Sequence, residues 1–123
     1  MSALTEALQK VMAVEGARAA ALIDIATGMV VRAVGEAEAG TDFPAAAACL
    51  ADEARLAAAL GLEQAGGGLD EITLITANRL HISRVLDSRP GEGCLLFVDL
   101  DRSRVNIALA SLRIGQLAPA VLG

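Results

Sequence analysis

Residues 94–100 read CLLFVDL, a run that is apolar at every position except Asp99. The run has the length of a strand, and up to Asp99 it is apolar on both alternating sets of positions. A strand with two apolar faces lies centrally in a sheet that is covered on both sides. These residues therefore predict the middle strand of a sheet with helices on either face.

The preceding sequence supplies four more strands and two helices. Leu4, Leu8 and Val11 recur at helical spacing until Gly16, which predicts a first helix. Strands are predicted over residues 17–25, 29–34, 71–77 and 80–86, and Gly28 supplies the positive φ of a tight turn between the first two. A second helix is predicted over 42–60, and loops over 35–40, 61–68 and 87–93.

A final helix follows the central strand. Asp101 or Ser103 is expected to cap it, and Pro119 to end it. Its predicted inward stripe consists of Val105, Ala108, Leu109 and Leu112. The element order is helix, two strands, helix, three strands, helix. Most strand connections are short, so the fold class is α/β with a mainly antiparallel five-stranded sheet and helices on both faces.

Composition excludes several classes of function. The 123 residues carry a formal net charge of −5, which disfavours binding to nucleic acid or to an anionic membrane. Phe43 and Phe97 are the only aromatic residues, too few for base stacking. No signal peptide or membrane-spanning run is recognisable, so we expect a cytoplasmic protein with reduced cysteines.

The predicted second helix is apolar around most of its circumference. Phe43, Ala47, Leu50, Ala54 and Ala57 form the side expected to face the sheet. Cys49, Leu56 and Leu60 form a second apolar side, and contiguous exposed apolar surface usually marks an interface. We therefore expect self-association through this helix. The alternative is that an alanine-rich composition makes every helix apolar.

The predicted third strand gives a second argument for self-association. It contains Ile72, Thr73, Leu74, Ile75 and Thr76, with neither Pro nor Lys and with no charge after Glu71. Such a strand at a sheet edge has nothing to discourage pairing with another chain. Pairing across a two-fold axis would extend the sheet.

Catalytic and metal-binding patterns are weak. His81 is the sole histidine, and it could pair with Cys49 or Cys94 only if the fold brought them together. Asp99 and Asp101 form a carboxylate pair, which we interpret as Asp99 leaving the sheet and Asp101 capping a helix. Asp24 is interpreted as a turn residue. The sequence has no phosphate-binding glycine motif, and we expect no metal, no cofactor and no enzymatic activity.

Three stretches resemble a known family: ALIDIATGMVVRAVG at 21–35, ITLITANRLHISRVL at 72–86 and LLFVDLDRSRVNIALASLRIGQL at 95–117. With the alanine-rich helix between them, they are similar to the Roadblock family of dynein light chains and their bacterial relatives. The resemblance extends from about Leu4 to Leu117. It implies a single Roadblock-like domain over residues 1–123, with a profilin-like fold.

The resemblance also implies a mode of action. Family members form two-fold dimers in which the strand after the second helix pairs with its twin and the second helices lie side by side. Bacterial members act on Ras-like small GTPases, activating or localising them, across the helical surface of the dimer. The corresponding surface here consists of Ala48, Asp52, Glu53, Arg55 and Ala59. No catalytic residue can be carried over, and Arg55 is the first arginine to test.

The expected function is therefore that of a non-enzymatic homodimeric regulator or adaptor of a small GTPase. Two alternatives stay open: a structural scaffold that ignores the nucleotide state of its partner, and a small-molecule sensor.

Overall fold

The computed structural model describes residues 2–35, 42–60, 69–86 and 93–122. The predicted loops at 36–40, 61–68 and 87–92, and Thr41, lie outside these residues. The described elements, in chain order, are α1 (Ala3–Val11), β1 (Ala17–Asp24), β2 (Val30–Gly35), α2 (Phe43–Ala59), β3 (Glu71–Ile75), β4 (Arg79–Leu86), β5 (Cys94–Asp101), the 3-10 helix η2 (Arg102–Arg104), α3 (Ile107–Leu117) and the 3-10 helix η3 (Ala118–Val121).

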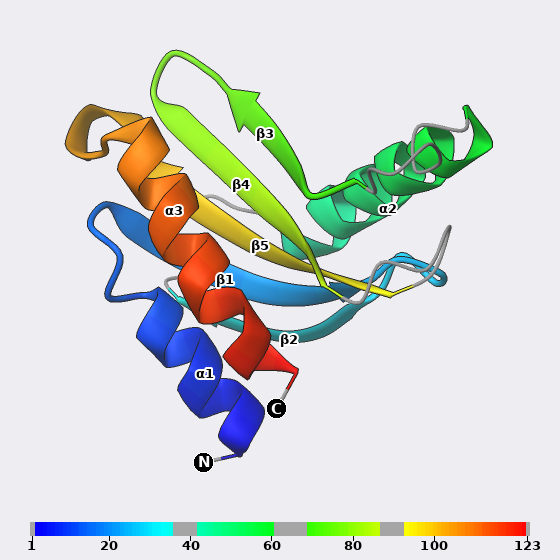
Figure 1. Cartoon of the computed structure of the whole chain (residues 1–123), viewed down its shortest axis with the longest axis horizontal. Coiled ribbons are helices and arrows are strands. Elements are labelled where there is room, and N and C mark those ends of the chain that lie inside the picture. Colours follow the sequence, from blue (N-terminus) through cyan, green and yellow to red (C-terminus); the bar gives the residue numbers. More distant parts are fainter. Residues whose placement is uncertain (1, 36–41, 61–68, 87–92, 123) are drawn as a thin grey trace.

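The strands form one antiparallel sheet in the order β2-β1-β5-β4-β3 (Figure 1). β5 is the middle strand, as predicted, and its residues from Leu95 to Leu100 are buried. β3 lies at one edge and pairs with β4 alone among the described strands. The predicted fold class is confirmed.

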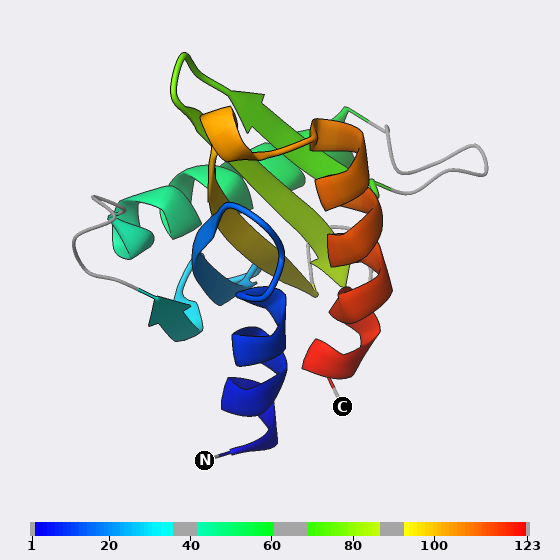
Figure 2. The same cartoon turned by 90° about the vertical axis from the view of Figure 1, so that its left-hand side faces the viewer.

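Helices cover the sheet on both faces (Figure 2). α1 and α3 share one face, where Leu8, Val11 and Ile114 join a core with Leu80, Ile82 and other strand residues. α2 lies on the other face, where Leu50 and Ala54 pack in a core with Ile23, Leu95 and Phe97. Within the described ranges, one face therefore carries α1 and α3 and the other carries α2.

The turn between β1 and β2 is built as the sequence predicted. The Asp24 carboxylate accepts hydrogen bonds from the Thr27 backbone N–H at 3.0 Å and from the Thr27 hydroxyl at 2.6 Å. Gly28 has a φ of +72°, a conformation that favours glycine. Asp24 is thus a turn residue.

The predicted start and inward stripe of the final helix are wrong. α3 begins at Ile107 because the Asn106 side chain caps it, accepting a hydrogen bond from the Leu109 backbone N–H at 3.0 Å. Asp101 caps the short helix η2 instead, and its hydrogen bonds from the Ser103 hydroxyl and backbone hold the pKa of this carboxyl below its ordinary value. The buried residues of α3 are Ala110 and Ile114, whereas Ala108, Leu109 and Leu112 are exposed.

Two smaller predictions are also corrected. The third strand ends at Ile75 rather than at residue 77. Asp99 does not leave the sheet: it is fully buried inside β5. No helix among the described residues is both long enough and apolar enough to cross a membrane.

Candidate partner-binding surface

α2 is held against the sheet by one side only. Asp42 caps its first turn by accepting a hydrogen bond from the Ala45 backbone N–H at 3.2 Å. The predicted inner residues Ala47, Leu50, Ala54 and Ala57 are buried. Phe43 is partly buried and meets the edge of the Phe97 ring, with ring centroids 6.2 Å apart. The predicted orientation of the helix is therefore confirmed.

The opposite side of α2 is exposed, and it is apolar over much of its length. Leu56 is 57% exposed and Leu60, just after the helix, is 64% exposed. The other candidate residues on this side are also exposed: Ala48, Cys49, Asp52, Glu53 and Ala59. Two large exposed leucines beside small alanines make a smooth apolar surface that a partner can cover.

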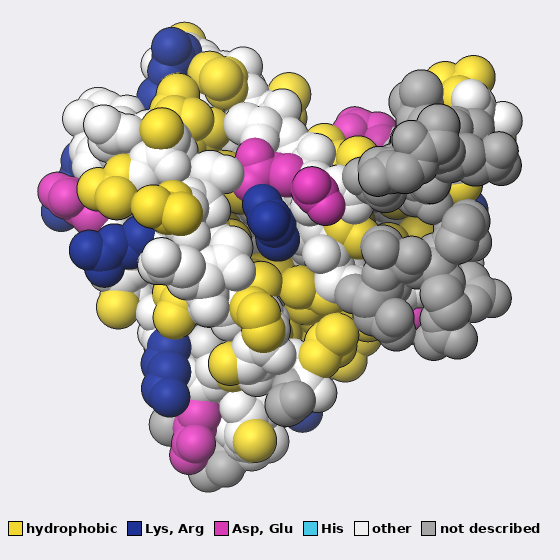
Figure 3. Space-filling view, in the orientation of Figure 1, with side chains coloured by type: hydrophobic (Ala, Val, Ile, Leu, Met, Phe, Trp, Pro, Cys, Tyr) yellow, Lys and Arg dark blue, Asp and Glu magenta, His cyan; other side chains and the backbone are white. Residues whose placement is uncertain are grey.

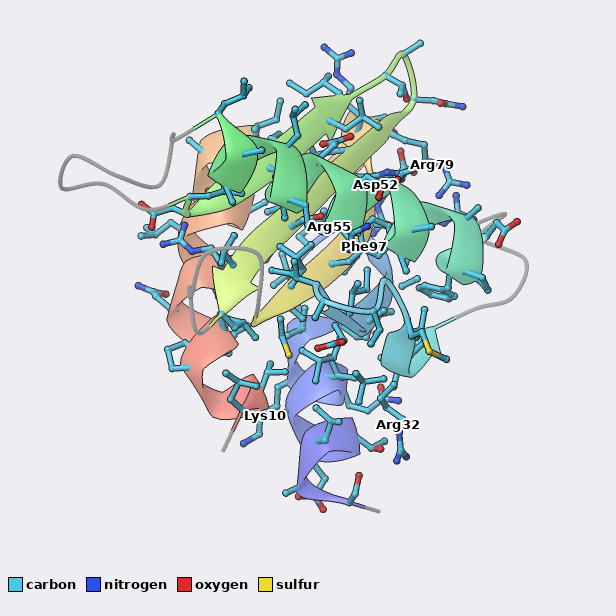
Figure 4. The ribbon with its side chains drawn as sticks, turned by 90° about the vertical axis from the view of Figure 1, so that its right-hand side faces the viewer. Lys10, Arg32, Asp52, Arg55, Arg79 and Phe97 are labelled. Carbon is cyan, nitrogen blue, oxygen red and sulfur yellow. The ribbon has the colours of Figure 1, made fainter. Side chains whose placement is uncertain are left out.

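Arg55 is already engaged within the protein. One of its guanidinium nitrogens, Nη1, donates to the backbone carbonyl of Ile25 at 2.6 Å, and the other, Nη2, forms an ion pair with Asp52 (Figure 4). The side chain therefore ties α2 to the end of the β1–β2 hairpin. In this conformation it supports the surface rather than projecting from it.

The edge strand β3 exposes both apolar side chains and backbone hydrogen-bonding groups. Leu74 is 53% exposed and Ile75 is 48% exposed, whereas Ile72 is half-buried. The hydrogen bonds from Val85 N to Asp70 O and from Thr76 N to Arg79 O fix which residues bond to β4. By the alternation of an antiparallel pair, the backbone groups of Glu71, Thr73 and Ile75 point away from β4, toward the open edge. Thr73 is the middle of these three positions.

A groove runs between α2 and the β3–β4 side of the sheet. Among the strands, α2 packs most extensively against β1 and β2, so β3 and β4 are left partly open on this face. The resulting cavity has a volume of about 310 Å³. Its lining consists of Ala45, Ala46, Cys49, Leu50 and Glu53 from α2 and of Ile72, Thr73, Leu74, His81, Ser83 and Phe97 from the sheet.

The groove contains one polar group that no described residue satisfies. The Ser83 hydroxyl is fully buried and makes no hydrogen bond to the described residues. A buried hydroxyl without a partner is destabilising by about 1–3 kcal/mol. The Ser83 hydroxyl therefore lowers the stability of this part of the sheet.

The sequence favours a packed or surface strand histidine at position 81 over a pair with Cys49 or Cys94, and the structure places His81 in β4, partly buried. His81 and Cys49 line the same groove, but Nε2 of His81 lies 3.1 Å from Oδ1 of Asp99. Cys94 pairs with Leu86 at the other end of β4 and β5. Among the described residues, no group of three His, Cys, Asp or Glu side chains could hold a metal ion.

Sequence reasoning missed a buried ionic cluster around Asp99. Nη1 of Arg79 lies 2.7 Å from Oδ2 of this carboxylate, and His81 approaches its other oxygen. The strand register explains the cluster, because β4 places His81 directly opposite Asp99. The signal in the sequence was a charge inside an apolar strand, which requires a partner of opposite charge.

The comparisons with known proteins give a consistent set of neighbours. No protein-family model and no curated protein sequence matches the chain. Among solved structures, the gliding protein MglB from Thermus thermophilus matches with a TM-score of 0.78 and 20% identity, covering 97% of this chain and 85% of that one.

Two further structures agree with it. An MglB with a tetrameric arrangement matches with a TM-score of 0.72 and 21% identity, over 96% of this chain and 87% of that one. A Roadblock/LC7 domain from Streptomyces avermitilis matches with a TM-score of 0.70 and 18% identity, over 97% of this chain and 91% of that one. At such identities the likeness shows a shared fold.

Proposed function

We propose that this chain, which has the Roadblock fold, is a non-enzymatic homodimer that regulates or recruits a separate Ras-like small GTPase in the cytoplasm. The observation that carries the proposal is the unequal covering of the sheet. Among the described residues, two helices cover one face, whereas only α2 lies on the other and leaves an apolar groove beside the edge strand β3. A second copy of the chain would cover the groove and would pair with the edge of β3.

The geometry of such a dimer follows from the edge strand. Antiparallel addition of β3 to its twin would use the outward backbone groups of Glu71, Thr73 and Ile75 and would make one continuous sheet. The second α2 would then lie on the same face, beside the first. Leu56 and Leu60 would become buried, and Cys49 and the groove around Ser83 would be covered by the twin.

Support for self-association also comes from a structural neighbour. One matching MglB structure is described as having a tetrameric arrangement, so that protein assembles with itself. The exposed leucines of α2 and the open β3 edge are features of this chain itself and lead to the same proposal.

The choice of a small GTPase as partner rests on the resemblance to bacterial Roadblock proteins. The surface proposed for it consists of Ala48, Asp52, Glu53, Arg55 and Ala59, which the paired helices would present together. Arg55 would maintain the shape of this surface through its bond to the β1–β2 hairpin. The chain would change the activity of its partner by binding one nucleotide state more tightly than the other.

The test measures binding of the purified chain to small GTPases from the same organism, each loaded with GDP or with a non-hydrolysable GTP analogue. We expect a dimer that binds one GTPase with a clear preference for one nucleotide state. The chain alone should neither bind nor hydrolyse GTP. Equal binding to both states would instead support a scaffold, and the absence of any GTPase partner would refute the regulatory role.

A further inference from the structure

The groove between α2 and the β3–β4 side of the sheet has a polar group in its floor. Ser83 of β4 lies directly opposite Ile72 of β3 and Phe97 of β5, and all three residues line the groove. Residues opposite each other in an antiparallel sheet point to the same face, so these side chains form one row beneath α2. The Ser83 hydroxyl is fully buried and has no hydrogen-bond partner among the described residues. The row is therefore apolar except for one unsatisfied hydroxyl.

Small side chains on α2 leave the groove open. The helix lines it with Ala45, Ala46 and Cys49, and the lining continues to Glu53, about 12 Å further along the helix than Ala45. At about 30 Å³ for each water-sized atom, the volume of about 310 Å³ corresponds to about ten non-hydrogen atoms. The groove therefore has the dimensions of a site for a small molecule.

The charges around the groove disfavour an ionic ligand. Among the described residues that line it there is no Lys or Arg, and Glu53 is the acidic one. His81 contacts the buried Asp99 carboxylate, which also forms an ion pair with Arg79. An anion would meet the Glu53 carboxylate without a cation from the lining, and a cation would lose its hydration beside the apolar floor. A neutral molecule with one polar atom matches the groove better than either ion.

We propose that this groove binds a small, neutral, apolar molecule with a single hydroxyl or carbonyl group, of the class of medium-chain alcohols and ketones. Its polar atom would hydrogen-bond to the Ser83 hydroxyl, and its apolar part would contact Ile72 and Phe97. The leucines that a twin would bring to this side, Leu56 and Leu60, have no polar atom to offer this hydroxyl. The site goes beyond the proposed GTPase role and does not depend on it. In the proposed dimer the twin would close over the bound molecule.

Binding is measured by heteronuclear NMR titration of the whole chain with 1-octanol and with 2-octanone. The backbone resonances of Ala46, Thr73 and Ser83 should shift in a saturable manner, whereas those of α3 should not. Octanoate and octylamine have the same chain length with an anionic or a cationic end, and they should bind at least about tenfold more weakly. No saturable shift with either neutral molecule would overturn the proposal, and so would equal or tighter binding of either ion.

Two variants locate the ligand. Ser83→Ala removes a hydroxyl that bonds to no described residue, so the fold should be kept, and it should weaken octanol binding about five- to tenfold. Cys49→Phe places a large ring beside the groove from an exposed position of α2, and it should weaken binding about tenfold or more. Circular dichroism checks the fold of each variant. Unchanged affinity in Ser83→Ala would overturn the proposal.

The matched control lies on the other face of the sheet. Figure 3 shows this face, where hydrophobic, basic and acidic side chains are mixed over α1 and α3. The hydroxyl of Ser111 on α3 donates a hydrogen bond to the Glu71 carboxylate at 2.7 Å. Ser111→Ala therefore removes a serine hydroxyl away from the groove, and octanol binding should stay unchanged. Equal weakening by Ser111→Ala and Ser83→Ala would overturn the assignment of the ligand to the groove.

Leu56→Glu separates the ligand from the twin. Leu56 is not among the described residues that line the groove, so this variant should bind octanol as the wild type does. The Ser83 and Cys49 variants are also measured in this background. Binding by Leu56→Glu but not by the wild type would overturn the proposal, because the twin would then be the occupant of the groove. The proposed function fails separately, if the wild type is monomeric or binds no GTPase while octanol binding persists.

Discussion

Replacing Leu56 by Glu should dissociate the proposed dimer. Fully burying a leucine side chain contributes about 1.5–3 kcal/mol, and Leu56 is 57% exposed in one copy, so covering the rest is worth about 1–1.5 kcal/mol. A two-fold interface contains the residue twice, which gives about 2–3 kcal/mol. That corresponds to an increase in Kd of about 30- to 150-fold, and the cost of desolvating two carboxylates adds to it.

The assay is sedimentation velocity or light scattering over a range of protein concentrations. The wild type should have the mass of a dimer at micromolar concentration, and Leu56→Glu should have that of a monomer with unchanged circular dichroism. Leu109→Glu is the matched control, since Leu109 is a helical leucine of similar exposure on the other face. A wild type that is already monomeric at micromolar concentration, or a variant that stays dimeric, would refute the reasoning.

Three further predictions concern the edge strand β3, the ion pair of Arg79 with Asp99, and the hydrogen bond from Arg55 to the Ile25 carbonyl. Thr73→Pro removes a backbone N–H that points away from β4, so it should abolish dimer formation by light scattering while the monomer stays folded. Arg79→Met removes the guanidinium that is ion-paired with the buried Asp99 carboxylate, and it should lower the free energy of unfolding in urea by about 3 kcal/mol. Arg55→Ala leaves the Ile25 carbonyl without its donor and should lower that free energy by about 1–2 kcal/mol.

The first two of these predictions have control variants, and the third has an outcome that would contradict it. Thr73→Val keeps the backbone N–H and should remain dimeric, and a dimeric Thr73→Pro would rule out pairing through β3. Adding Asp99→Asn to Arg79→Met should restore part of the lost stability, since it removes the uncompensated charge. For Arg55, an unchanged urea midpoint in the alanine variant would show that its bond to the hairpin contributes nothing to stability.

The sequence predicted the strands and α2 well because their patterns are local. Residues 94–100 are apolar at nearly every position, and the buried side of α2 follows from helical periodicity alone. Gly28 and Asp24 marked the hairpin through turn chemistry that involves only neighbouring residues. The exposure of Leu56 and Leu60 could be predicted for the same reason.

The wrong predictions concern features that are determined by competing local caps or by contacts between residues far apart in the sequence. Asp101 and Ser103 have the residue types of a helix cap, but Asn106 caps α3. The side of α3 that packs on the sheet carries Ala110 and Ile114, so Leu109 and Leu112 face outward. The partners of the Asp99 carboxylate depend on which residues of β4 lie opposite it, and this strand register cannot be read from the sequence. The groove beside α2 likewise depends on where the helix sits on the sheet.

The buried Asp99 has a consequence for how the sheet assembles. An apolar run such as CLLFVDL could align with its neighbours at several offsets, because one leucine packs much like another. The carboxylate restricts that freedom: sliding β4 by two positions, so that Ser83 lay opposite Asp99, would move both His81 and Arg79 farther from the buried carboxylate. The buried Asp99 carboxylate thereby favours one register of β4 against β5. Sheets in which these two apolar strands are misaligned are destabilised relative to the native sheet.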